Sequence, residues 1–148
     1  MRNAYKYLAF AIPVLVVVQA MAIAFEVFGL GAYVDDHGLP KGAFSGDNSA
    51  PSFFGDAGGA IHAIDGTFLI PLIALALLVV SFFAKVPGGT KFALFIVLDV
   101  IVQIMLAFIA FGAVIVGPLH ALNAFVLMGL GAVAGRKAME PSTQAASV

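Results

Sequence analysis

The sequence predicts an all-α integral membrane protein, a four-helix transmembrane bundle built from two repeated helical hairpins. Of its 148 residues, 62% are hydrophobic and 10% are charged, whereas a soluble domain carries about 25% charged residues. The mean hydropathy is +1.09. Four separate stretches are apolar enough to form membrane-spanning helices, each of which needs about 20 residues. Two pairs of short motifs also recur along the chain.

The composition excludes several functional classes. The net charge is −1 and no basic stripe is present, which argues against a nucleic-acid partner. The chain has no Cys, so disulfides, iron–sulfur clusters, thiolate zinc sites, covalent c-type heme and thiol nucleophiles are excluded. It contains no Walker loop, dinucleotide fingerprint or nucleophile–base–acid set. We therefore expect no independent catalytic activity.

The four expected spans are helices, since a closed barrel needs alternating polar and apolar residues and the run 72–80 does not alternate. They cover approximately residues 7–34, 60–84, 92–116 and 119–135. Residues 85–91 form a tight basic turn, Gly117-Pro118 is a near-minimal reversal, and 35–59 is a long glycine-rich outer loop. The tail 140–148 is expected to be disordered, and the whole chain is a single transmembrane domain.

The cations predict the orientation in the lipid bilayer. Six of the seven lie on one side of the four expected spans, namely Arg2, Lys6, Lys85, Lys91, Arg136 and Lys137. The exception is Lys41, in the outer loop. Because Lys and Arg are enriched in cytoplasmic segments, both termini should be cytoplasmic, in a bacterial plasma membrane. The first apolar run continues well past Ala22, so we interpret it as a retained helix and not as a signal peptide.

Two motif pairs indicate an internal repeat. His62 and Asp65 open the second span, and His120 and Asn123 open the fourth in the same pattern. The surroundings of Gln19 in the first span resemble those of Gln103 in the third. The glutamines are further apart in the sequence than the histidines, by close to the length of the outer loop, so the first copy carries this loop as an insertion. Two hairpin copies with parallel topology would make His62 and His120 a facing pair near the outer end, with the glutamines nearer the midplane.

These histidines are the main candidates for chemistry. Each is followed three residues later by a carboxylate or carboxamide on the same helix face, Asp65 or Asn123. Two imidazoles that meet across a bundle core suit the axial positions of a b-type heme, and a hydrogen-bond acceptor orients each ring. Glu26, in the outer half of the first span, either lines this cofactor site or reaches the outer interface. The sequence thus predicts heme b between His62 and His120.

Other interpretations stay open. The two histidines can simply hydrogen-bond to Asp65, Asn123 or main-chain carbonyls. Together with Asp65 and Glu26 they can also form a mixed nitrogen–oxygen metal site. The glutamines and Asp99 are interpreted as contacts between helices, and His37 as a solvated loop residue.

The motif of a helix-initial His, followed by a carboxylate or carboxamide, resembles one half of heme A synthase. That family has two four-helix halves, each with heme-ligating histidines at the outer ends of its second and fourth helices. The resemblance implies His62 and His120 as ligands. The family's catalytic Glu stands about one turn before a ligand, whereas this chain has Gly58 and Val116 at those positions, so oxidation of a heme methyl is not implied.

Through residues 80–89 and 119–124, the chain also resembles small four-span actinobacterial membrane proteins of uncharacterised function. We therefore predict electron transfer or heme handling beside a membrane redox or respiratory complex. One alternative is a non-catalytic accessory subunit of a larger membrane complex that docks through the loop 35–59. Another is a binder of a quinone, a pigment or a metal.

Overall fold

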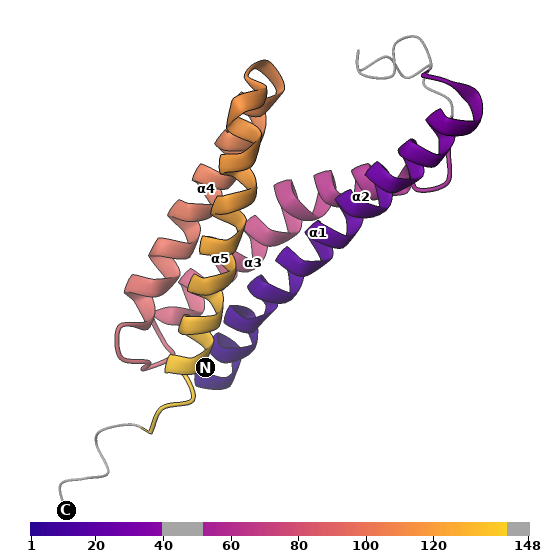
Figure 1. Cartoon of the computed structure of the whole chain (residues 1–148). Coiled ribbons are helices and arrows are strands. Elements are labelled where there is room, and N and C mark those ends of the chain that lie inside the picture. Colours follow the sequence, from indigo (N-terminus) through magenta and orange to yellow (C-terminus); the bar gives the residue numbers. More distant parts are fainter. Residues whose placement is uncertain (40–51, 142–148) are drawn as a thin grey trace, which may run out of the picture. The chain divides into compact units, whose positions relative to one another are not determined.

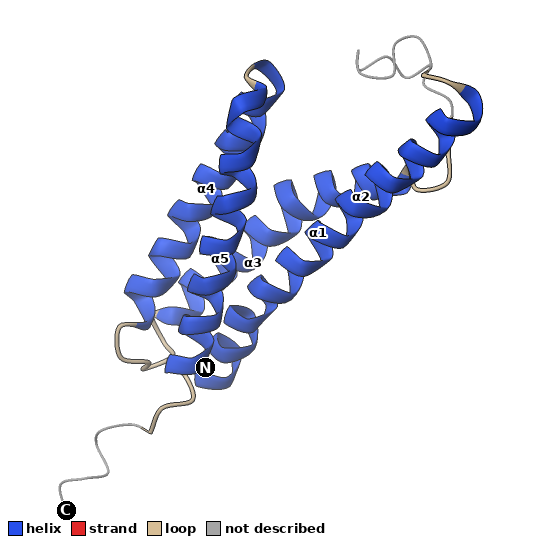
Figure 2. Ribbon diagram, viewed as in Figure 1, coloured by secondary structure: helices blue, strands red, loops and turns tan. Residues whose placement is uncertain are grey.

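A computed structural model describes residues 1–39 and 52–141, and these are helical apart from short connections (Figures 1 and 2). The elements are α1 (Arg2–His37), α2 (Ala57–Ile64), the π-helical turn η1 (Asp65–Leu69), α3 (Ile70–Ser81), α4 (Gly89–Gly112), the 3₁₀ turn η2 (Val114–Val116) and α5 (Gly117–Lys137). Four helices, 2–37, 57–81, 89–112 and 114–137, are long and apolar enough to cross a membrane. The predicted fold class, an all-α four-helix transmembrane bundle, is confirmed.

The helix ends differ from the expected spans for local reasons. α1 continues to His37 because its first break is Gly38, which has φ +77° and whose N–H bonds to the Val34 carbonyl at 2.8 Å. This is the usual left-handed glycine end of a helix. α2 begins at Ala57, so the outer loop is shorter at both ends than expected. Lys41 and the tail from residue 142 lie outside the described residues.

The connection between α4 and α5 is short, but it lies at residues 113–116, before the predicted reversal at Gly117-Pro118. α4 ends where Ala113 takes an extended conformation with φ −139° and ψ 84°. The 3₁₀ turn follows, and α5 then starts at Gly117 with a proline in its first turn. Proline is favoured there because its missing N–H would have no partner in the helix.

The chain divides into two compact units, and each is described by itself. Unit 1 consists of residues 1–16 and 66–148, and unit 2 consists of residues 17–65. In unit 1, α4 packs against both α3 and α5 (Figure 1). The largest fully buried side chains of its core are Tyr5, Ile12, Leu77, Ile96 and Leu127.

Small residues bring helices close together in unit 1. Gly131 of α5 lies against α1, since a Cβ there would be 2.9 Å from Cβ of Ile12 and 2.8 Å from Cδ of Pro13. The hydroxyl of Tyr5 donates to the carbonyl of Gly89 at 2.9 Å and is fully buried. Such close approach is typical of helix packing in membranes, where no hydrophobic effect drives association.

The buried positions of unit 1 follow the predicted repeat. Those of α1 are Tyr5, Ala9, Ile12 and Val16, and those of α4 are Gly89, Ala93, Ile96 and Val100. Taken in order, the two sets form four pairs, such as Tyr5 and Gly89. The residues of each pair are as far apart in the sequence as Gln19 and Gln103 are. α1 and α4 therefore bury the same face of a common pattern.

Unit 2 is held together by glycines where α2 meets α1. A Cβ on Gly58 would overlap the carbonyl oxygen of Ala22 and would lie 2.9 Å from the Glu26 nitrogen. Any side chain at position 58 would therefore push α2 away from α1. This contact sets the depth at which His62, one turn further along α2, meets α1.

Candidate functional site

His62 lies in a hydrogen-bonded cluster with Gln19 and Asp65 in unit 2. The Gln19 Nε2 donates to the main-chain oxygen of His62 and to Asp65 Oδ2, both at 2.9 Å. In return, His62 Nδ1 lies 3.3 Å from the main-chain oxygen of Gln19. The contact between Gln19 and His62 is reciprocal, because the side chain of each residue bonds to the main-chain oxygen of the other.

His120 lies in a cluster of the same design in unit 1. Gln103 Nε2 donates to the main-chain oxygen of His120 at 3.0 Å, and His120 Nδ1 lies 3.0 Å from the main-chain oxygen of Gln103. Asn123 Nδ2 donates to Gln103 Oε1 at 2.8 Å. Asn123 therefore stands where Asp65 stands in the other cluster, as the third polar partner.

The two clusters match position by position. Gln19 corresponds to Gln103, and His62 to His120, in the register that the sequence pattern indicates. Each glutamine is bonded to the histidine that follows it in the chain. The expected facing of the two glutamines stays a prediction.

The hydrogen bonds define the tautomer of both imidazoles. A carbonyl oxygen can only accept, so the Nδ1 beside it carries the proton. In the neutral ring, Nε2 then holds the lone pair. At His120 this agrees with the Gln103 Nε2, a donor, at 3.3 Å from His120 Nε2. Imidazoles that bind a metal through Nε2 commonly donate Nδ1–H to a carbonyl in this way.

Each cluster has a nearby aspartate, Asp65 in unit 2 and Asp99 in unit 1, and the contacts of the two differ. Asp65 is 6% exposed, accepts from Gln19 through Oδ2, and has no hydrogen bond to Oδ1 among the described residues. Asp99 of α4 lies near Asn123, whose Nδ2 is 3.5 Å from the Asp99 carbonyl, and its buried Oδ2 also lacks a described partner. The contact of Asp99 with a neighbouring helix is therefore present.

Glu26 lies next to the His62 cluster, further toward the C-terminal end of α1. It is two turns beyond Gln19 on the same face of α1. Its carboxylate covers Gly59, where a Cβ would lie 2.5 Å from Oε1 and 2.7 Å from Oε2. Since Gly59 precedes His62 by three residues, the carboxylate stands about one helical turn from the histidine. Of the two roles expected for Glu26, this favours the position beside the cluster.

The other candidate sites from the sequence are His37 and the mixed metal site. His37 is exposed at the end of α1, with its Nδ1 3.2 Å from the Tyr33 carbonyl. No three His, Asp or Glu side chains gather into a possible metal site in the part of the chain that the structure describes. The mixed nitrogen–oxygen metal site expected from the two histidines, Asp65 and Glu26 stays a prediction. The facing of His62 and His120 stays a prediction.

No protein-family model, curated protein or solved structure matches the chain. The resemblance to half of heme A synthase thus stays a matter of the two short motifs. Any assignment of function must rest on the two matched clusters and their chemistry.

Proposed function

We propose that the chain is a membrane protein that binds one b-type heme through His62 and His120. The observation that supports this most directly is the recurrence of one contact, Nδ1 against a main-chain carbonyl, at both histidines. It leaves the Nε2 lone pair as the metal-binding atom in each ring. At His120, this atom would exchange its contact with Gln103 Nε2 for the iron.

In this proposal the surrounding residues orient the ligands. The main-chain oxygens of Gln19 and Gln103 accept from the histidine Nδ1 atoms, which orients each imidazole ring. The glutamine amides hold the backbone of each histidine. Asp65 and Asn123 in turn hold the two glutamine amides. A bound heme supplies one-electron chemistry, and bis-histidine ligation suits electron transfer or heme handling, without an independent catalytic activity.

The proposed setting is a bacterial plasma membrane with both termini on the cytoplasmic side. All six cations expected on that side belong to unit 1. Three of them, Lys6, Lys91 and Lys137, lie over aromatic rings at 4.7, 5.5 and 5.4 Å from the ring centroid. Such residues anchor spans at the membrane surface. We further propose a membrane redox or respiratory complex as the partner.

Absorption spectroscopy of the detergent-purified protein tests the proposal. We expect a Soret band and a sharp α-band on reduction, with about one heme per chain. His62→Ala and His120→Ala should each remove most of the heme, whereas the matched variant His37→Ala should retain it. If colour persists in both ligand variants, the assignment of ligands is wrong.

A second candidate function is that of a non-catalytic accessory subunit. It is supported by the same clusters viewed as ties between helices, since the bonds made by the two glutamine side chains each join two helices. A colourless, metal-free preparation that co-purifies with a larger complex would favour this function over the heme proposal.

A further inference from the structure

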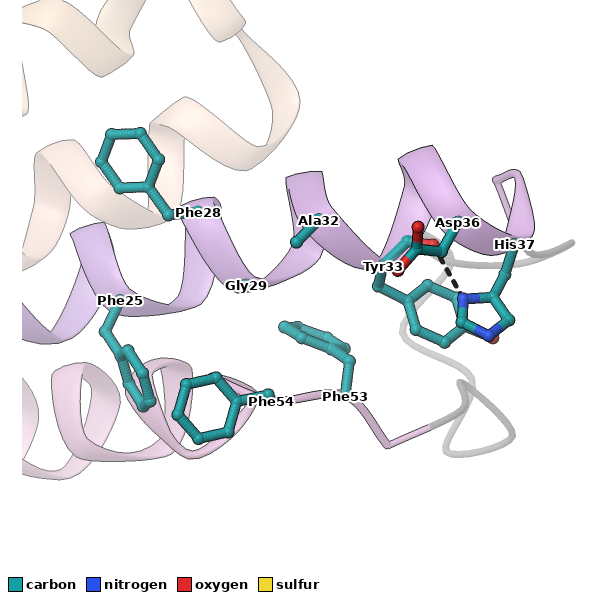
Figure 3. A pocket seen from close by; sticks show the side chains of 9 residues that line it. All are labelled: Phe25, Phe28, Gly29, Ala32, Tyr33, Asp36, His37, Phe53 and Phe54. Carbon is teal, nitrogen blue, oxygen red and sulfur yellow. Dashed lines mark hydrogen bonds between the residues drawn. The ribbon is translucent and has the colours of Figure 1, made fainter.

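Unit 2 contains a cavity whose lining does not include the residues of the His62 cluster. It lies between the second half of α1 and the segment 52–56, and its volume is about 440 Å³ (Figure 3). That size is within the range of small-molecule sites. The side chains that decide its chemistry are Phe25, Tyr33, Asp36, His37, Phe53 and Phe54.

Backbone contacts define the walls of this cavity. A Cβ on Gly29 would overlap the carbonyl oxygen of Phe54. Gly55 has φ +115°, and a Cβ there would lie 2.6 Å from the carbonyl oxygen of Phe25. Glycine is required at both positions, since α1 and the following segment touch through their main chains. These main-chain contacts hold the segment 53–55 against α1 beside the cavity.

The lining is aromatic along one side of α1. Phe25 and Phe54 meet edge to face, with ring centroids 5.3 Å apart, and Tyr33 lies 6.2 Å from Phe53. Rings in such arrangements present both faces and edges to a guest. A flat conjugated ring gains more from these contacts than a flexible alkyl chain does.

The polar groups gather at the far end of the cavity. Figure 3 shows Asp36 and His37 beyond the phenyl rings, at the last turn of α1. The His37 ring stacks on Tyr33 at 4.6 Å, and its Nδ1 faces the Tyr33 carbonyl at 3.2 Å. As in the two histidine clusters, Nδ1 carries the proton, so Nε2 accepts in the neutral ring. Both Asp36, with its carboxylate, and His37, with an acceptor nitrogen, line this end of the cavity.

We propose that this cavity binds the ring of a lipid-soluble molecule of the quinone class, in its hydroquinone form with a hydroxyl toward Asp36 and His37. The aromatic lining suits the ring, the polar end suits its oxygen, and α1 is long and apolar enough to span the membrane from which such a molecule arrives. Binding of this molecule does not depend on the heme. Only its role as a redox partner of the heme rests on the proposed function.

The cavity is close to the His62 cluster along α1. Phe25 and Gln19 are less than two helical turns apart on this helix, which corresponds to about 9 Å along its axis. Glu26 follows Phe25 directly and covers Gly59 on α2. A ring bound at Phe25 would therefore lie near His62 within the same unit.

Calorimetric titration of the detergent-purified protein with menadione and with its reduced form is the test. We expect saturable binding of one molecule per chain, tighter for the reduced form. Phe54→Ala should weaken it about fivefold, and Gly29→Ala should abolish it. Phe82→Ala is the matched control, since Phe82 is 65% exposed, Phe54 is 86% exposed, and only Phe54 lines the cavity.

Three results would overturn the inference. One is uptake that never saturates, and another is binding that Phe54→Ala and Gly29→Ala leave unchanged. The third is equal competition by decanol, which would make the cavity a site for an alkyl chain. A red protein without menadione binding would contradict this inference alone, and a colourless protein that binds menadione would contradict the heme proposal alone.

Discussion

The amide of Gln19 offers a quantitative test of the cluster in unit 2. Gln19→Leu removes the donor to the His62 carbonyl and to Asp65 Oδ2, both at 2.9 Å. Because Asp65 is 6% exposed and its Oδ1 has no described partner, the variant leaves the whole carboxylate buried without a hydrogen bond. The loss is therefore larger than that of two bonds.

Gln103→Leu is the matched variant in unit 1. It removes the bonds to the His120 carbonyl at 3.0 Å and from Asn123 at 2.8 Å, together with the longer contact of Gln103 Nε2 with His120 Nε2 at 3.3 Å. Asn123 is neutral and keeps its contact with the Asp99 carbonyl at 3.5 Å. No unpaired charge is created, so the cost is that of the bonds alone.

The expected magnitudes follow from these contacts. A hydrogen bond between membrane helices contributes about 0.6 kcal/mol and up to about 1.7 kcal/mol. Two bonds give about 1–3 kcal/mol for Gln103→Leu. An unsatisfied buried polar group adds about 1–3 kcal/mol, and more when it is charged. Gln19→Leu should therefore cost about 2 kcal/mol more than Gln103→Leu.

Unfolding in mixed detergent micelles, followed by the helical circular dichroism signal, measures both free energies. The background Asp65→Asn supplies the control, since it removes the charge and gives the first cluster the side chain of the second. There the gap between the two glutamine variants should close. Equal costs in the native background, or a gap that persists with Asp65→Asn, would show that the extra cost does not come from the Asp65 carboxylate.

Two further predictions concern packing and topology. Gly131→Ala should lower the free energy of unfolding by about 1–3 kcal/mol, since its Cβ would meet Ile12 at 2.9 Å, whereas Gly129→Ala, with nothing within 4 Å, should not; equal melting of both variants would contradict the packing. Because the chain has no Cys, a membrane-impermeant maleimide added to whole cells should label Ser52→Cys and not Glu140→Cys, and the reverse labelling would invert the proposed orientation.

The sequence was sufficient for the parts of the fold that depend on composition and spacing. Four apolar helices follow from the cost of exposing backbone to lipid, whereas the reversal between α4 and α5 lies a few residues before the predicted Gly117-Pro118. The pairing of Gln19 with His62 could not be predicted in the same way. It depends on the rotation and depth of α1 against α2, which the close contact at Gly58 sets. The recurrence of both residues was the available signal, because repeated polar side chains in apolar helices need partners.

The aromatic cavity was missed for a different reason. Phe53 and Phe54 belong to the predicted loop, and phenylalanine is so frequent in the chain that no pattern singles them out. Their approach to α1 requires Gly29 and Gly55 in one register, and Gly55 in a left-handed conformation. The contact between these two glycines and the opposite main chain cannot be predicted from composition.

The π-helical turn Asp65–Leu69 has a consequence for the history of the chain. Up to this turn, the second span matches the fourth in the register that pairs His62 with His120 and Asp65 with Asn123. Beyond it, the register shifts by a single position. The buried residues of α3 then match buried residues of α5 and its C-cap, in the pairs Ile70 and Leu127, Ala74 and Gly131, Leu77 and Ala134, and Ser81 and Ala138.

α5 is regular over the corresponding stretch, so the first copy contains an additional residue that the second lacks. A π turn is the form in which a helix accommodates such a single-residue insertion. If the two halves arose by duplication, the insertion came afterwards, and the turn let both ends of the helix keep their original faces. The histidine at one end and the packed residues at the other could then diverge separately.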